Sequence, residues 1–81
     1  MISYEDEIRP LVAEACGVDA AGLLRDRPLV EYGLDSARAV DLVVALEERF
    51  HLRISDNDAL HLRSLADIDA FVVRAAGGRG K

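Results

Sequence analysis

Apolar residues recur three or four positions apart in three stretches of the chain, which is the spacing of one face of an α-helix. The first stretch predicts a helix over about residues 4–16, with Ser3 as a possible N-cap and Gly17 as its stop. Pro10 lies inside this stretch and removes one backbone hydrogen bond. We therefore expect the helix either to kink at Pro10 or to begin later, near Asp6.

The most confidently helical pattern covers about residues 36–50, which contain neither Gly nor Pro. At about 100° per residue its apolar side chains separate into two arcs. The first arc is wide enough to face a core and consists of Ala39, Leu42, Val43, Leu46 and Phe50. The second arc is an apolar strip of Ala37, Val40 and Val44. It is bordered by the acidic residues Asp41, Glu47 and Glu48. Such a strip is either a second core face or an exposed surface for a protein partner, and periodicity leaves both open.

Residues 18–35 lie between these two helices and show no sustained period. A structureless connection of this length is uncommon in a compact domain. We therefore expect a helical turn near residues 20–24 and several leucines packed under the bundle.

The last third of the chain predicts two further helices after an extended link. Ser55 or Asp56 is placed to cap a brief helix over about residues 56–61. Ser64 is placed to cap a last helix that ends near Ala75, with Asp67 at the capping-box position. The buried stripe of this last helix is expected to be Leu65, Ile68, Phe71 and Val72.

The expected fold is therefore all-α, a four-helix bundle of three longer helices and one short helix, with a long first loop. Residues 1–76 form its single domain, and 77–81 are expected to be a flexible tail. Hydrophobic content of 51% with only 5% aromatic residues and no Trp leaves the core to Leu, Val, Ile and Ala, a mix that favours helices over sheets.

The net charge and the length of the apolar segments make several functions improbable. Fifteen acidic and ten basic side chains give a net charge of −5, which disfavours binding to nucleic acid or to anionic lipid. No apolar run approaches the roughly 18 residues of a membrane span, and there is no signal-like N-terminus, so we expect a cytoplasmic monomer. The lone Cys16 has no partner for a disulfide and is expected to be a small buried hydrophobe.

No catalytic constellation or metal-ligand spacing is evident, so the sequence predicts no catalytic residue and no metal site. The only histidines, His51 and His61, lie beyond the helix that Ser36 begins. What remains is Asp35-Ser36 at a helix start, which reads most simply as an ordinary N-cap. A helix N-terminus also offers free N–H groups and a positive dipole end, which suit a phosphate esterified there.

A family resemblance begins at this dipeptide. Gly33-Leu34-Asp35-Ser36 resembles the attachment motif of the acyl carrier protein family, in which the serine accepts the 4′-phosphopantetheine arm of coenzyme A. Residues 40–50 resemble the second helix of that family almost position for position. Ile54, the acidic step at 56–58 and the helix at 65–71 also fall where the family has them, so the resemblance spans about residues 4–73.

The resemblance implies that Ser36 carries the prosthetic group covalently, next to Asp35. It implies a modifying enzyme, the phosphopantetheinyl transferase, and later partners that load, condense or transfer acyl or aminoacyl groups. The chain itself would be a non-catalytic carrier that holds its cargo as a thioester. The implied partner-binding face consists of Ala37, Arg38, Val40, Asp41, Val44, Glu47 and Glu48.

Two positions depart from the pattern of fatty-acid carriers. Position 37 is Ala where the family often has Leu, Ile or Met, and position 38 is Arg where fatty-acid carriers are commonly acidic. These departures favour a discrete carrier of a specialised pathway, such as polyketide or aryl and aminoacyl biosynthesis. The alternatives are a housekeeping carrier of fatty-acid synthesis and an unmodified helical interaction module with a capping Ser36.

Overall fold

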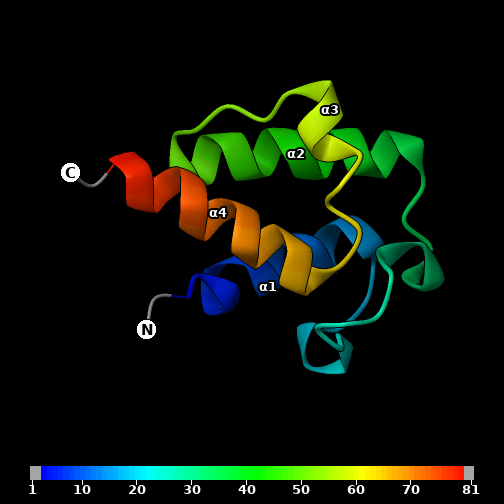
Figure 1. Ribbon diagram of the computed structural model, residues 1–81. Coiled ribbons are helices and arrows are strands. Elements are labelled where there is room, and N and C mark those ends of the chain that lie inside the picture. The colour runs from blue at the N-terminus through cyan, green and yellow to red at the C-terminus, as the bar shows by residue number, and fades with distance from the viewer. Residues whose placement is uncertain (1–2, 80–81) are drawn as a thin grey trace.

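The computed structural model describes the backbone of residues 3–79 and the side chains of residues 3–76. Within these residues the chain is helical, without a strand, which confirms the predicted all-α four-helix fold. The helices and the two 3-10 turns are α1 (Glu5–Cys16), η1 (Ala20–Gly22), η2 (Leu29–Tyr32), α2 (Ser36–Phe50), α3 (Asp56–Ala59) and α4 (Leu65–Arg79). Helix α1 packs against both α2 and α4, while the long first loop turns at one end of the bundle (Figure 1).

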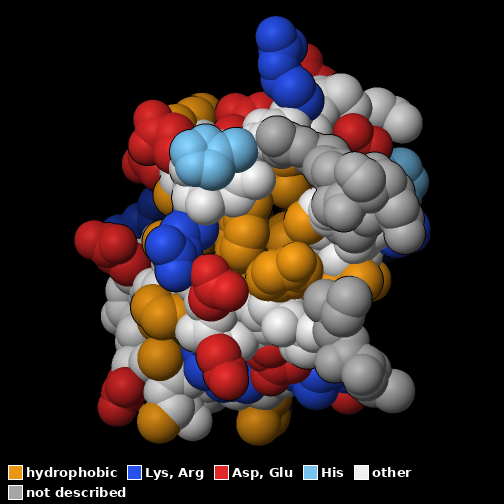
Figure 2. Space-filling model, turned by 90° about the vertical axis from the view of Figure 1, so that its left-hand side faces the viewer, with side chains coloured by type: hydrophobic (Ala, Val, Ile, Leu, Met, Phe, Trp, Pro, Cys, Tyr) orange, Lys and Arg blue, Asp and Glu red, His pale blue; other side chains and the backbone are white. Residues whose placement is uncertain are grey.

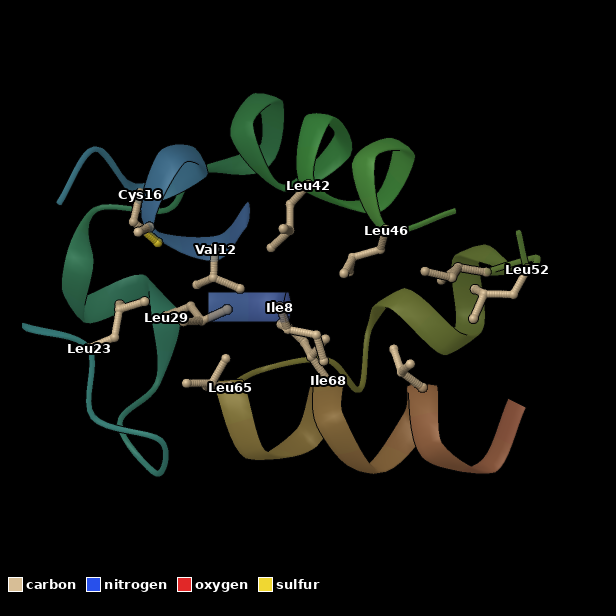
Figure 3. Packing of buried hydrophobic residues seen from close by; sticks show 13 residues of the cluster. Ile8, Val12, Cys16, Leu23, Leu29, Leu42, Leu46, Leu52, Leu65 and Ile68 are labelled. Carbon is tan, nitrogen blue, oxygen red and sulfur yellow. The ribbon is translucent and has the colours of Figure 1, made fainter. Parts of the chain in front are cut away.

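The core lies where α1, α2 and α4 converge (Figure 3). Leu42 and Leu46 point inward from α2, and Ile68 points toward them from α4. The apolar stripes predicted for these helices therefore do face the interior, with Val43, Phe50 and Phe71 packed at its margin. Ala39 is half-buried and lines the two hollows beside α2. The fully or nearly fully buried apolar side chains are Ile8, Val12, Ala13, Cys16, Leu23, Leu29, Leu42, Leu46, Leu52, Ile54, Leu65, Ile68 and Val72.

The start of α1 is held from α4, which sequence periodicity did not predict. The N-cap position is Tyr4, not Ser3, and its own side chain makes no capping hydrogen bond. Instead the buried carboxylate of Asp69 accepts hydrogen bonds from the Tyr4 N–H at 2.7 Å and from the Ser3 hydroxyl at 3.2 Å. A carboxylate at this end of a helix is favoured by the helix dipole. Ser3 still contributes locally, because its Oγ accepts the Glu5 N–H at 3.2 Å, so Asp69 adds a distant cap to the predicted local one.

Helix α1 begins at Glu5, one residue before the predicted start near Asp6, and continues through Pro10 to Cys16. Pro10 leaves the Asp6 carbonyl without its intrahelical donor. Both residues are exposed, so water can satisfy that carbonyl. The predicted stop is confirmed: Gly17 has φ 72°, in the left-handed region that glycine adopts without steric cost.

Two short turns organise the loop between α1 and α2. The turn predicted near residues 20–24 is present as η1, whereas η2 was not predicted, because four residues are too few to show a helical period. Arg9 of α1 fixes the loop by donating to the carbonyls of Ala20 at 3.1 Å and Leu23 at 2.7 Å. Leu23 and Leu29 of this loop are buried and Leu34 packs partly buried against the core, whereas Leu24 remains exposed.

Glu5 links the loop to α1 through two ion pairs. Its carboxylate lies 2.7 Å from Arg9 Nη2 and 3.0 Å from Arg25 Nε. The hydrogen bond from Arg9, followed by that from Arg25, lowers the pKa of Glu5 below its ordinary value. A depressed carboxyl pKa stabilises the folded state above the unfolded-state pKa and loses that effect as the pH falls through the folded-state pKa.

We therefore predict that Glu5→Gln lowers the free energy of unfolding by about 1 kcal/mol at pH 7. The difference from the wild type should shrink below about pH 4, where the wild-type carboxyl also becomes protonated. Denaturant unfolding at both pH values measures it. Asp6→Asn is the matched control in the same turn, since Asp6 makes no ion pair among the described residues. A deficit of Glu5→Gln that is equally large at low pH would contradict the prediction.

The later helices follow the predicted order but not all of the predicted bounds. Ser55 caps α3 in a capping box with Asp58, and α3 ends at Ala59, two residues earlier than expected. Ser64 Oγ accepts the Asp67 N–H as predicted, while the Asp67 carboxylate accepts from Arg63 N–H rather than completing a box with Ser64.

Helix α4 continues past the predicted end at Ala75 to Arg79. Two glycines weaken a helix by roughly 1 kcal/mol each, yet no proline blocks its continuation. The predicted tail thus begins inside helical backbone. Residues 80–81 and the side chains of 77–79 lie outside the described part, and the predicted flexibility stays a prediction.

The face of the bundle at the C-terminal end of α2 has an apolar centre and a charged border. Figure 2 shows hydrophobic side chains at the centre of this face, with acidic and basic side chains around them. A hollow here is lined by Glu47, His51, Leu52, Arg53 and Ala75. The Ser36 end of α2 lies on the opposite side of the molecule, beside the long loop (Figure 1).

Candidate functional site: the start of helix α2 and its outer face

The start of α2 is built by Gly33 and Asp35. Gly33 ends η2 with φ 90°, a conformation that side chains with a Cβ rarely adopt. Asp35 follows in an extended conformation as the N-cap, and its carboxylate accepts the Arg38 N–H at 2.9 Å. Ser36 is therefore the first residue inside the helix, and the simple interpretation of Ser36 as the cap is wrong.

The hydroxyl of Ser36 is consequently available. The side chain is exposed, and among the described residues its Oγ makes no hydrogen bond. No histidine is hydrogen-bonded to Ser36 among the described residues: His51 is the C-cap at the far end of α2, and His61 Nδ1 lies 3.0 Å from the carbonyl oxygen of Asn57. The described residues also contain no cluster of metal-ligating side chains. Ser36 is thus a reachable hydroxyl without local activation.

The second apolar arc of α2 is exposed rather than buried. The exposed fractions are 61% for Val40 and 45% for Val44, whereas Leu42 and Leu46 on the same helix are buried. Ala37, Asp41 and Glu48 are exposed as well. Of the two interpretations left open by periodicity, the structure supports an exposed, acid-rimmed strip. Its role in partner binding stays a prediction.

Two members of the predicted face also have contacts within the fold. Glu47 is half-buried, and its carboxylate accepts the Ile54 N–H at 2.8 Å, which holds the link after α2. The Arg38 Nη1 lies 3.5 Å from where a Cβ on Gly17 would stand, beside the C-terminal end of α1. A cation is favourable there because it complements the helix dipole.

Cys16 is buried beside this guanidinium, as the sequence predicted for a small hydrophobe. Burial raises the pKa of its thiol, and the positive charge of Arg38 opposes that effect. A thiol with a raised pKa is mostly protonated at neutral pH and therefore a poor nucleophile. Cys16 is a core residue rather than a second reactive site.

Two adjoining hollows, which share Leu34, Ala39, Ala59 and Leu62 in their linings, lie along the first half of α2. One is bounded by α2 and α3, measures about 190 Å³ and is lined mainly by apolar side chains, among them Val40, Val43 and Ala59. The other lies beside Ser36 and is bordered by Val30, Leu60 and Arg63. Sequence reasoning missed these three residues, because they belong to loops and to the end of a short helix, where no periodicity marks a shared surface.

The site fits a phosphopantetheine group, since an exposed serine with an unengaged hydroxyl begins a helix behind a separate cap. Comparison with known proteins decides the family. Residues 6–72 match the model of a phosphopantetheine attachment site. The chain belongs to the acyl carrier protein family. It is a carrier protein, and the cofactor of its family is covalently bound 4′-phosphopantetheine, derived from coenzyme A.

The relatives are similar over nearly their whole length. The acyl carrier protein of Akkermansia muciniphila is 33% identical over 93% of this chain and 95% of its own. That of Chlamydia caviae is 31% identical over 94% of this chain and all of its own. Acyl carrier proteins are non-catalytic carriers that interact with enzymes of acyl biosynthesis.

Among solved structures, the HMG-ACPI domain from the CurA module of Lyngbya majuscula superimposes with a TM-score of 0.82. It covers 95% of this chain and 78% of that chain at 19% identity, which establishes the shared fold. In the described part of this chain, no helix has the length and hydropathy needed to cross a membrane.

Proposed function

We propose that Ser36 is the residue to which the phosphopantetheine arm is attached, and that the loaded chain presents acyl or aminoacyl thioesters to partner enzymes. The observation that carries this proposal is the division of roles at the start of α2. Asp35 makes the capping hydrogen bond, so the exposed Ser36 hydroxyl is left for modification. Family membership supplies the chemistry of the arm.

The attachment step is a phosphoryl transfer from coenzyme A. Ser36 Oγ forms the new bond to phosphorus, and the bond to the departing 3′-phosphorylated adenosine monophosphate breaks. The proton of the hydroxyl passes to a base of the phosphopantetheinyl transferase. On this proposal the transferase supplies the base and the divalent metal, and Ser36 Oγ makes no hydrogen bond to a histidine among the described residues.

The outer face of α2 is the proposed contact for the transferase and for the enzymes that load, condense or transfer the cargo. It combines the exposed Val40 and Val44 with the acids Asp41 and Glu48, and with Ala37 and Arg38 near the serine. An apolar strip inside a charged rim is a common interface composition. Glu47 contributes with the part of its carboxylate that does not hold Ile54.

A specialised pathway, such as polyketide or aryl and aminoacyl biosynthesis, is the preferred context, in the cytoplasm and as a monomer. Ala37 and Arg38 support it, because they depart from the pattern of fatty-acid carriers beside the attachment serine. Housekeeping fatty-acid synthesis is the second candidate, favoured by acyl carrier protein relatives at 31–33% identity. This second candidate would be favoured if a malonyl transferase of fatty-acid synthesis charges the chain and no loading enzyme of a specialised pathway does.

Incubation with coenzyme A and a broad-specificity phosphopantetheinyl transferase tests the attachment. We expect intact mass spectrometry to show one phosphopantetheine adduct per chain, and peptide fragmentation to place it on Ser36. A folded wild-type chain without an adduct would support the unmodified interaction module instead. An adduct on any other residue would overturn the assignment of Ser36.

Arg38 is expected to bias partner choice without controlling modification. Arg38→Glu reverses a rim charge, and rim charges act mainly on association rate and selectivity. Labelling by the transferase should stay within about threefold of the wild type. Stability should fall by up to about 1 kcal/mol, because an acid then faces the C-terminal end of α1. Initial labelling rates and thermal unfolding measure both, and complete loss of labelling in a folded variant would show that the recognition surface is misplaced.

A further inference from the structure

The hollow beside Ser36 is bordered by three separate segments. Val30 comes from η2, Ser36 from the start of α2, and Leu60 and Arg63 from the chain between α3 and α4. The exposed fractions of Val30 and Leu60, 72% and 69%, are the highest among the exposed large hydrophobic side chains of the described residues. Val30 and Leu60 line the same hollow as Ser36 and remain exposed among the described residues; we call this pair the Val30–Leu60 ledge.

Arg63 is the one cation that borders this hollow within the described residues. Its backbone is fixed on both sides, because its carbonyl accepts the Leu29 N–H at 2.8 Å and its N–H donates to the Asp67 carboxylate at 3.3 Å. Its Nε makes only a long hydrogen bond, 3.4 Å, to the Leu60 carbonyl. In the part of the chain that the structure describes, Arg63 forms no ion pair.

The acid that borders the hollow is Asp35, and its carboxylate is already engaged as the cap of α2. Among the residues that the structure describes, the hollow therefore combines one positive charge, whose Nη groups make no hydrogen bond or ion pair, with two exposed aliphatic side chains. A group tethered to Ser36 would meet the charge and the ledge together. A phosphodiester followed by a branched aliphatic segment has this composition.

We propose that this hollow is the resting site of the arm carried by Ser36, with the Arg63 guanidinium paired to the phosphodiester and the Val30–Leu60 ledge contacting its dimethyl segment. The inference rests on the proposed attachment at Ser36. Arg63 is a positioning residue: it orients the arm and takes no part in the bonds made or broken. A resting arm lies across η2 and the end of α3, in the hollow that adjoins the cavity between α2 and α3.

The contact is expected to be weak and reversible. An exposed ion pair shifts a conformational equilibrium by only about two- to fivefold, and salt weakens it. The arm would consequently leave the hollow when a partner enzyme binds, while its resting position keeps it from sampling all orientations. Removal of the Arg63 charge should reduce the resting population by about threefold.

The test uses the full chain, loaded with a phosphopantetheine arm that carries ¹³C and ¹⁵N. In the wild type we expect nuclear Overhauser contacts from the arm methyl groups to Val30 and Leu60, and arm amides less mobile than in free pantetheine. Arg63→Gln should weaken these contacts about threefold, as should about 0.5 M salt on the wild type. Arg53→Gln is the control, because Arg53 is exposed, has no ion pair among the described residues and does not border this hollow.

Each outcome has a distinct meaning. Absence of the contacts in a wild-type protein that carries the adduct on Ser36 overturns the resting site and leaves the proposed attachment intact. Absence of the adduct overturns the attachment itself. If Arg63→Gln, and the wild type at high salt, keep contacts as strong as those of the wild type at low salt, the role of Arg63 is overturned. The salt arm decides this last point even where Arg63→Gln does not fold.

Discussion

Ser36→Ala is expected to abolish phosphopantetheine incorporation while leaving the stability of the fold almost unchanged. The reason is the division of roles at the start of α2. Asp35 accepts the Arg38 N–H as the cap, whereas the Ser36 hydroxyl makes no hydrogen bond among the described residues. Alanine is also the best helix former, so the free energy of unfolding should change by less than about 0.5 kcal/mol.

Ser64→Ala is the matched control, because Ser64 is a true capping serine. Its hydroxyl is buried and accepts the Asp67 N–H at 3.2 Å. Loss of such a cap costs about 1 kcal/mol, which for a domain of this size lowers Tm by about 4–8 °C. Ser64→Ala should still be labelled at the wild-type level.

Intact mass after incubation with transferase and coenzyme A measures labelling, and thermal unfolding measures stability. Ser36→Ala should lose labelling and keep its stability, whereas Ser64→Ala should keep labelling and lose stability. Residual labelling of Ser36→Ala would mean that another residue carries the arm. A large loss of stability in Ser36→Ala would mean that the hydroxyl has a structural role, and the available hydroxyl would then no longer support the attachment.

The sequence predicted the parts of this fold that depend on local periodicity. The bounds of α2 are those expected, and its inward arc, with Leu42 and Leu46, is buried. Gly17 and Ser64 act as the stop and the cap that their residue types favour. In each of these cases the sequence signal, a helical period, a stop or a cap, lies within a few neighbouring positions of the chain.

The features that sequence reasoning missed depend on residues far apart in the chain. Asp69 holds the start of α1 across 65 positions, and no local pattern marks that contact. The turn η2 is too short for periodicity, and the exposure of Val30 and Leu60 depends on tertiary packing. At the candidate site, the motif predicts Ser36 as the attachment residue, which stays a prediction, and only the geometry showed that Asp35 makes the cap.

Leu46→Ala is expected to destabilise the bundle far more than Val44→Ala on the same helix. The exposed fraction of Leu46 is 1% and that of Val44 is 45%. Leu46 points into the core toward α4, so its truncation leaves a cavity and should cost about 3 kcal/mol (Figure 3). That is a large fraction of the roughly 4–12 kcal/mol expected for a domain of this length. Val44→Ala should cost less than about 0.5 kcal/mol, since alanine also favours the helix.

Denaturant unfolding of both variants measures the difference in stability, and transfer of a thioester-bound acyl group to a partner enzyme measures function. On the proposed role of the outer strip, Val44→Ala slows transfer while the fold stays stable. Leu46→Ala should reduce transfer only as far as it unfolds the chain, so that its effect diminishes as temperature is lowered from Tm. Equal destabilisation by the two variants would show that both arcs of α2 belong to the core. If stability is unchanged, truncation of Val44 can affect transfer only through binding to the partner enzyme. Normal transfer by Val44→Ala with every partner enzyme of the pathway would therefore show that Val44 lies outside the interface.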